Sequence, residues 1–87
     1  MYGYGRQTSV RYLTHEQLFN ERNNAQSRML YLQSEVQKAE FNMQCNPMNT
    51  SYLRKYIRIC AREYNQLYRR VNRLNMEIMR RQGYRNY

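Results

Sequence analysis

Apolar residues recur along this chain in two long runs, each with alternating steps of four and three residues. The first run extends from Leu18 to Met43 and the second from Leu53 to Ile78. This heptad-like spacing lines one apolar seam along an α-helix and is typical of coiled coils. Arg22 is the one polar residue at a seam position. The pattern predicts two long helices and an all-α fold.

Local signals predict where the first helix begins. Thr14 and Gln17 have the spacing of a capping box, in which each side chain bonds the other residue's backbone N–H. Leu13 and Leu18 have the spacing of a hydrophobic staple, which fixes the direction of the incoming chain. We therefore expect the first helix to begin at residue 15.

The remaining boundaries depend on a proline and a glycine. The residue before Pro47 avoids the α conformation, so the first helix should span 15–45 and a turn should occupy 46–49. The second seam starts soon afterwards, which predicts a helix over 50–82. Gly83 suits the position just past a helix C-terminus.

The two seams match each other across the turn. Met43 falls opposite Leu53, and each further step along one helix meets an equal step along the other, out to Leu18 opposite Ile78. Two unrelated heptad runs need not share such a register. The sequence thus predicts a long antiparallel two-helix hairpin, coiled-coil-like, formed by residues 14–82.

The hairpin returns the chain to its start, so two short tails rich in Tyr, Gly and Arg should lie at the same end. Residues 1–13 lack a sustained period and are interpreted as a flexible or partner-ordered arm, and 83–87 as a C-terminal tail. The tail residues that could stack on bases, contact phosphates or fill pockets on a protein are Tyr2, Tyr4, Arg6, Tyr84, Arg85 and Tyr87. Disordered ends are the alternative.

A two-helix seam leaves much apolar surface uncovered. The flanking charges look like poor support, since Glu35 falls opposite Glu63 and Arg28 opposite Arg70. We therefore expect self-association or docking into a larger complex. An apolar patch near the turn is a candidate protein-docking surface, formed by Tyr52, Tyr56 and Ile59.

Charge is concentrated on the second helix. The chain has 15 Lys and Arg against 6 acidic residues, for a net charge of +9. Nine of the basic residues fall within 50–82, where there are only two glutamates. A solvated helix face usually mixes both signs, so the asymmetry favours an anionic partner. The candidate binding residues are Arg54, Lys55, Arg58, Arg62, Arg69, Arg70, Arg73, Arg80 and Arg81.

Two classes of partner fit this basic surface. Nucleic acid is favoured, with non-specific binding to the phosphate backbone inside a virion or another nucleoprotein particle. The alternative is an acidic protein surface, for which the chain would act as an inhibitor, adaptor or assembly cement. Sequence-specific readout has no support, because no zinc-finger, recognition-helix or RNA-recognition motif is present.

Catalysis is not expected. The chain has no Asp, and the hairpin places its single histidine, His15, far from Cys45. A structural zinc site needs four ligands, whereas the chain has three Cys and His residues in all. Cys45 and Cys60 should be too far apart along the hairpin for an intrachain disulfide. We expect no enzyme, metal or cofactor, and no small-molecule substrate.

Hydropathy indicates where in or outside a cell the chain is expected to work. No apolar run approaches the length of a membrane span, and the start has no apolar segment typical of a signal peptide. A peripheral membrane helix is not expected, because the apolar seam is used within the hairpin. We expect a chain that is not secreted and works inside a cell, in cytoplasm or nucleus, or within a virus particle.

Overall fold

Two long helices make up most of residues 9–85, the part of the chain that the computed structural model describes. Helix α1 spans His15–Cys45 and helix α2 spans Thr50–Arg85. A short 3-10 turn, η3, connects them over Pro47–Asn49, and another, η2, precedes α1 at Val10–Tyr12. The predicted bounds of the first helix and of the turn are confirmed.

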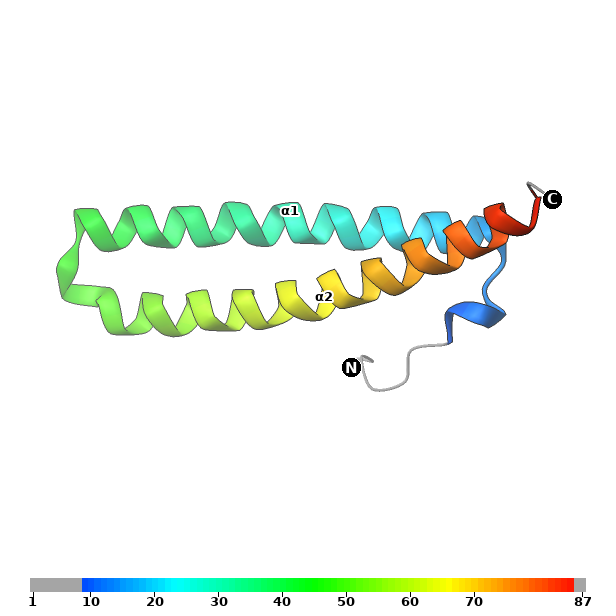
Figure 1. The fold of residues 1–87 in the computed structure, drawn as a ribbon. Coiled ribbons are helices and arrows are strands. Elements are labelled where there is room, and N and C mark those ends of the chain that lie inside the picture. Colours follow the sequence, from blue (N-terminus) through cyan, green and yellow to red (C-terminus); the bar gives the residue numbers. More distant parts are fainter. Residues whose placement is uncertain (1–8, 86–87) are drawn as a thin grey trace.

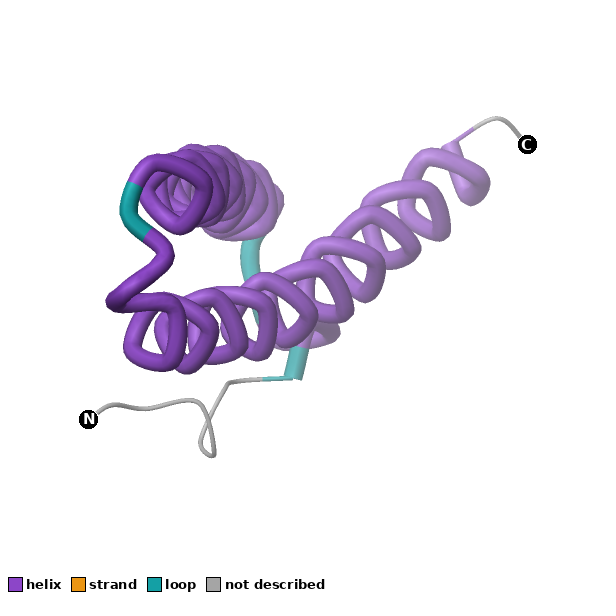
Figure 2. Tube along the Cα trace, turned by 90° about the vertical axis from the view of Figure 1, so that its left-hand side faces the viewer, coloured by secondary structure: helices purple, strands orange, loops and turns teal. Residues whose placement is uncertain are grey.

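The helices run antiparallel and pack against each other, as Figure 1 shows, so the all-α hairpin is confirmed. The turn lies at one end, and η2 lies with the last turns of α2 at the other. We call these the turn end and the tail end. Seen from the turn end in Figure 2, α1 is nearly end-on while α2 slants away to one side. The hairpin is therefore a pair of crossing helices.

The start of α1 has both local features that the sequence predicts. The Thr14 Oγ1 accepts the backbone N–H of Gln17 at 3.1 Å, and the Gln17 Oε1 accepts that of Thr14 at 2.9 Å. Leu13 and Leu18 belong to one apolar cluster, as a hydrophobic staple requires. Together these contacts fix the first helical residue at His15.

The seam between the helices is the predicted one. Every predicted seam residue is buried or half-buried, and Leu18 and Leu74 are completely inaccessible to solvent. The core is tighter toward the tail end, where Val71 and Ile78 are also buried. Near the turn, by contrast, seam residues such as Ile57 stay half-exposed. The shared register of the two apolar runs thus specified the pairing.

Arg22, the polar residue in the seam, is accommodated by its neighbours. It is half-buried, and its Nη1 donates a hydrogen bond to Asn75 Oδ1 on α2 at 3.4 Å. Its guanidinium also lies 5.0 Å from the centre of the Phe19 ring, a cation–π distance. The hairpin therefore keeps a cation in its seam by hydrogen bonding and ring contact.

The end of α2 differs from the prediction. The helix continues through Gly83 to Arg85, so residues 83–85 are helical instead of forming a tail. Gly83 does not adopt the left-handed conformation of a helix cap. A glycine inside a helix costs only about 1 kcal/mol relative to Ala, which neighbouring turns can offset. Gly83 was therefore a weak stop signal.

The described part of the predicted arm packs on the hairpin. Val10 and Leu13 pack onto the apolar cluster of Leu18, Leu74 and Ile78 at the tail end. Residues 9–13 are thus folded against the hairpin, because two apolar side chains in this stretch can cover the end of the seam. The rest of the predicted arm, 1–8, lies outside the described residues.

Candidate anion-binding surface of the second helix

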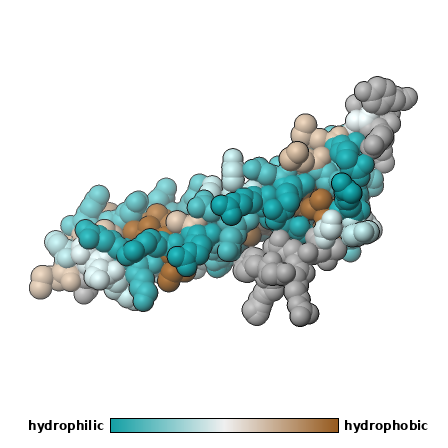
Figure 3. Space-filling view, turned by 60° about the horizontal axis from the view of Figure 1, so that its bottom comes forward, coloured by the Kyte–Doolittle hydropathy of each residue, from teal (hydrophilic) through white to brown (hydrophobic). Residues whose placement is uncertain are grey.

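Seven of the nine predicted binding residues are exposed on α2, all except Arg70 and Arg81. Arg80 contacts Glu77, and we call the other six the outer stripe: Arg54, Lys55, Arg58, Arg62, Arg69 and Arg73. Figure 3, viewed from the α2 side, shows strongly hydrophilic residues in a band along the molecule. These six side chains are therefore accessible to a partner, and their role in binding stays a prediction.

Helical spacing sets the geometry of the outer stripe. Lys55, Arg62 and Arg69 follow one another at seven-residue intervals, which separates them by about 10 Å along the axis. The whole stripe, from Arg54 to Arg73, extends over about 28 Å of helix. Because the helix is rigid between these positions, the stripe presents a fixed line of cations.

The outer stripe is not neutralised within the hairpin. Among residues 9–85, none of its six side chains forms an ion pair with a carboxylate. Five of the six are Arg, whose planar donor fork matches the oxygens of phosphate and carboxylate groups. The stripe can therefore bind an extended anionic partner without first breaking intramolecular contacts.

Arg70 does not belong to the outer stripe. Only 5% of its surface is exposed, and its Nη2 contacts Glu21 Oε2 of α1 at 2.8 Å. Its position beside the seam explains the difference, because a side chain there reaches the facing helix more readily than solvent. Arg70 therefore connects the two helices, and its role in binding a partner stays a prediction.

The flanking charges also pair differently from the sequence-based expectation. Arg28 Nε lies 2.7 Å from Glu63 Oε2, and the Tyr56 hydroxyl donates a 2.7 Å hydrogen bond to Glu35. Each of these long side chains extends beyond the residue directly opposite it. It reaches a carboxylate about one heptad further along the facing helix. Like charges at one level repel each other, so these diagonal contacts are preferred. The flanks support the hairpin instead of opposing it.

Arg80 and Arg81 are likewise engaged within the chain. Both contact the carboxylate of Glu77, which is 5% exposed, and the Arg81 Nε lies 2.8 Å from it. The Arg81 Nη2 also donates to the backbone carbonyls of Leu13 at 2.8 Å and Arg11 at 3.3 Å. This Glu77–Arg81 cluster joins the arm to the last turns of α2. Arg80 and Arg81 therefore have a structural role within the hairpin.

The Glu77–Arg81 cluster predicts an acid-sensitive hairpin. Hydrogen bonds from Arg80 and then Arg81 lower the pKa of Glu77 from 4.5 to about 2. Because this pKa is lower in the folded chain, the contribution to stability is complete above pH 4.5 and is lost as the pH falls toward 2. The hydroxyl of Tyr56 lowers the pKa of Glu35 as well, which acts in the same direction.

We expect the melting temperature, followed by circular dichroism, to fall as the pH is lowered from about 5 to about 2. Glu77→Gln should melt lower than the unmodified chain near pH 6 and lose less stability on acidification. Glu40→Gln, which alters an exposed carboxylate of α1, serves as the control and should keep the original pH profile. An unchanged pH profile in Glu77→Gln would contradict the assignment.

Two of the three residues of the predicted docking patch are exposed, and the third is half-buried. Tyr52 and Ile59 are 74% and 53% exposed, respectively, and remain available to a partner. Tyr56 is half-buried against the core cluster, and its hydroxyl is bonded to Glu35. The contact with Glu35 also raises the pKa of Tyr56, which keeps the hydroxyl protonated. Tyr56 therefore stabilises the hairpin and is not an open docking residue.

The predicted tail contacts fall largely outside the described residues. The structure does not describe Tyr2, Tyr4, Arg6 and Tyr87, nor the side chains of Tyr84 and Arg85. The role of the tails in binding stays a prediction.

Other chemistry is sparse in the described part of the chain. Cys45 is exposed, Cys60 is buried, and both are free, as the predicted separation requires. Within residues 9–85, no cluster of His, Cys, Asp or Glu could hold a metal ion. Over the same residues, neither helix has an apolar stretch long enough to cross a bilayer.

Two features were missed by the sequence analysis. One is the Glu77–Arg81 cluster, for which the spacing of four residues was a visible signal. The other is a groove between the helices near Cys60, lined by Gln33 and Gln37 of α1 and by Ala61 and Asn65 of α2. Its signal was Ala61, a small residue beside the seam.

Comparison with known proteins leaves the surface to be interpreted from its own chemistry. No protein-family model, curated protein or solved structure matches the chain.

Proposed function

We propose that this chain is a small non-enzymatic structural protein that binds the phosphate backbone of nucleic acid through the outer stripe. One observation carries the proposal: six exposed cations lie along one helix, and none is paired with a carboxylate in the described part of the chain. Binding of this kind suits a component of a larger nucleoprotein assembly, such as a virus particle.

The geometry of the outer stripe supports backbone contact without base readout. A line of cations about 28 Å long would follow about eight base pairs, at 3.4 Å per step of one strand. Positive charges fixed along a rod bind phosphates wherever they occur, so such contacts carry affinity without sequence information. The proposal therefore specifies non-specific binding.

An acidic protein partner is a second candidate. The exposed Tyr52 and Ile59 near the turn favour it, because aromatic and aliphatic anchors beside cations are typical of protein interfaces. Such a partner would also contact Arg54 and Lys55, which lie near Tyr52 in the first turns of α2. The two candidates differ in whether a bare phosphate polymer is sufficient for binding.

Salt dependence tests the proposed function directly. Fluorescence anisotropy with generic duplex DNA should give a log–log slope of affinity against salt of about −3 to −5, as expected for three to six phosphate contacts. Raising salt from about 50 to 200 mM would then weaken binding by about 60- to 1,000-fold. Single-stranded DNA and RNA should bind with similar but somewhat shallower slopes.

The absence of binding to all three polymers at about 50 mM salt would contradict the proposal. So would an affinity that does not change with salt. Either result would direct attention to an acidic protein that contacts Tyr52 and the turn end of α2.

A further inference from the structure

One side of the hairpin carries little charge over a long stretch. We call it the neutral face and define it by six exposed residues: Gln26, Gln33 and Gln37 on α1, and Ala61, Asn65 and Tyr68 on α2. Further toward the tail end, the same side of each helix carries only Asn, Phe and Met, as far as Phe19 on α1 and Met79 on α2. Among the charged residues of these two spans, Arg22 alone reaches this side, because its guanidinium leaves the seam to contact Phe19 and Asn75. The others lie on the opposite flank or on the outer side.

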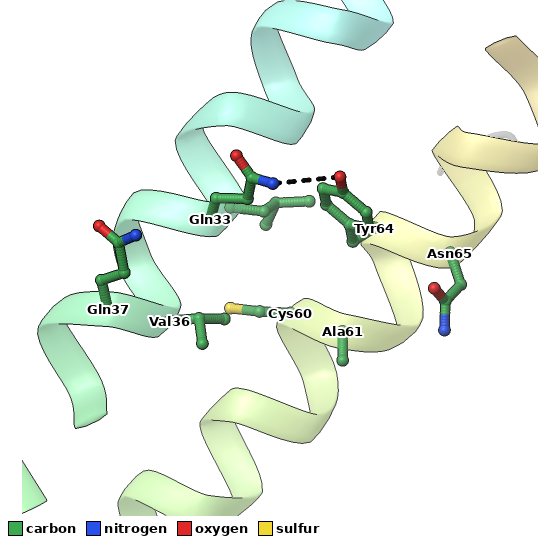
Figure 4. A pocket seen from close by; sticks show the side chains of 8 residues that line it. Gln33, Val36, Gln37, Cys60, Ala61, Tyr64 and Asn65 are labelled. Atoms are coloured by element: carbon green, nitrogen blue, oxygen red, sulfur yellow. Dashed lines mark hydrogen bonds between the residues drawn. The ribbon is translucent and has the colours of Figure 1, made fainter.

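The neutral face also exposes part of the seam. A groove of about 410 Å³ opens there, and its lining includes Leu32, Val36 and Cys60. Figure 4 shows Val36 and Cys60 pointing toward each other between the helices, with Ala61 beside them. Ala61 is too small to cover the seam, so apolar atoms remain accessible. This combination of apolar floor and uncharged rim is typical of the centre of a protein interface.

Amide and hydroxyl groups surround the groove. The Gln33 Nε2 donates a 3.2 Å hydrogen bond to the Tyr64 hydroxyl, which links the two helices across it (Figure 4). Gln37 and Asn65 complete the polar rim. Each amide offers both donors and an acceptor, so the rim can pair with a copy of itself. Such self-complementarity is what a twofold contact requires.

Net charge restricts how two copies of this chain can meet. With a net charge of +9, two hairpins repel each other through most orientations. The neutral face reduces this repulsion, because contact there leaves Lys55, Arg62, Arg69 and Arg73 of both copies on the outside. The charge distribution therefore allows a second copy of the chain to pack on the neutral face and opposes its packing on the outer stripe.

We propose that a second copy of this chain packs on the neutral face, so that two hairpins form a four-helix bundle. Residues 61–79 of α2 cover about 27 Å, and two helices side by side are about 20 Å wide. The contact would then involve about 540 Å² on each copy and about 1,100 Å² in total. This is the low end of specific interfaces, so the dimer should dissociate on dilution to about micromolar concentration.

Sedimentation equilibrium of the full chain tests the proposal, at about 2 to 200 µM. The unmodified chain should form dimers, and added salt should strengthen them because it screens the repulsion. Asn65→Lys places cations against each other across the neutral face and should weaken dimerisation by at least about 100-fold. Gln66→Lys adds the same charge to the next residue, which faces away from the groove, and should leave the dimer intact.

Circular dichroism must show that both variants remain helical. If Asn65→Lys unfolds, Gln37→Lys on the other rim of the groove provides the same test. A chain that stays monomeric at about 200 µM would overturn the proposal, as would equal dimerisation of Asn65→Lys and Gln66→Lys. Because the neutral face and the outer stripe share no residue, failure of one proposal leaves the other standing.

Discussion

Duplex DNA should bind about 100- to 500-fold more weakly when Arg58, Arg62 and Arg69 are all replaced by Gln, measured at about 0.1 M salt. Each phosphate contact contributes nearly a factor of ten at that salt concentration through counterion release. The log–log salt slope should decrease in magnitude by about three at the same time. The helix should be unaffected, because Gln and Arg have similar helix propensities and these side chains are exposed.

A charge-matched comparison separates the outer stripe from overall charge. Arg62→Gln with Arg69→Gln removes two charges from the stripe and should weaken binding by about 10- to 60-fold. Arg11→Gln with Lys38→Gln removes two exposed charges from the arm and α1, and should weaken it by less than about threefold. Equal losses in the two double variants would mean that net charge alone, and not the stripe, governs binding.

Leu67→Asp should unfold the hairpin. Leu67 is 8% exposed and belongs to the core cluster that includes Leu32, so the substitution buries a charge without a partner. A core this small supplies no more than about 3–5 kcal/mol of stability, which such a substitution can remove completely. Far-ultraviolet circular dichroism at 25 °C should lose most of its helical signal.

Ile59→Asp is the control for this loss. Ile59 lies on the same helix but is 53% exposed, so the new carboxylate stays in water and the helical signal should persist. If Leu67→Asp remained fully helical at low concentration, the seam could not be the structure that holds the helices together. The register between the two apolar runs would then have to be rejected.

The sequence by itself determined the helices, their bounds at the turn and their register. Each of these features is a local or periodic property. The capping box at Thr14 acts within one helical turn, Pro47 restricts its immediate neighbour, and the matched apolar steps leave one pairing that buries both seams. The exposure of Lys55, Arg62 and Arg69 followed as well, because residues opposite a buried seam must face solvent.

The tertiary structure alone decided which polar side chains meet. Arg70 and Arg81 have the same chemistry as the stripe residues, yet one contacts Glu21 across the seam and the other holds Glu77 and the arm. Long side chains select among several carboxylates within reach, and helix crossing sets those distances. The groove beside Ala61 likewise arises from how far apart the two helices lie, and that separation is a property of the packed pair.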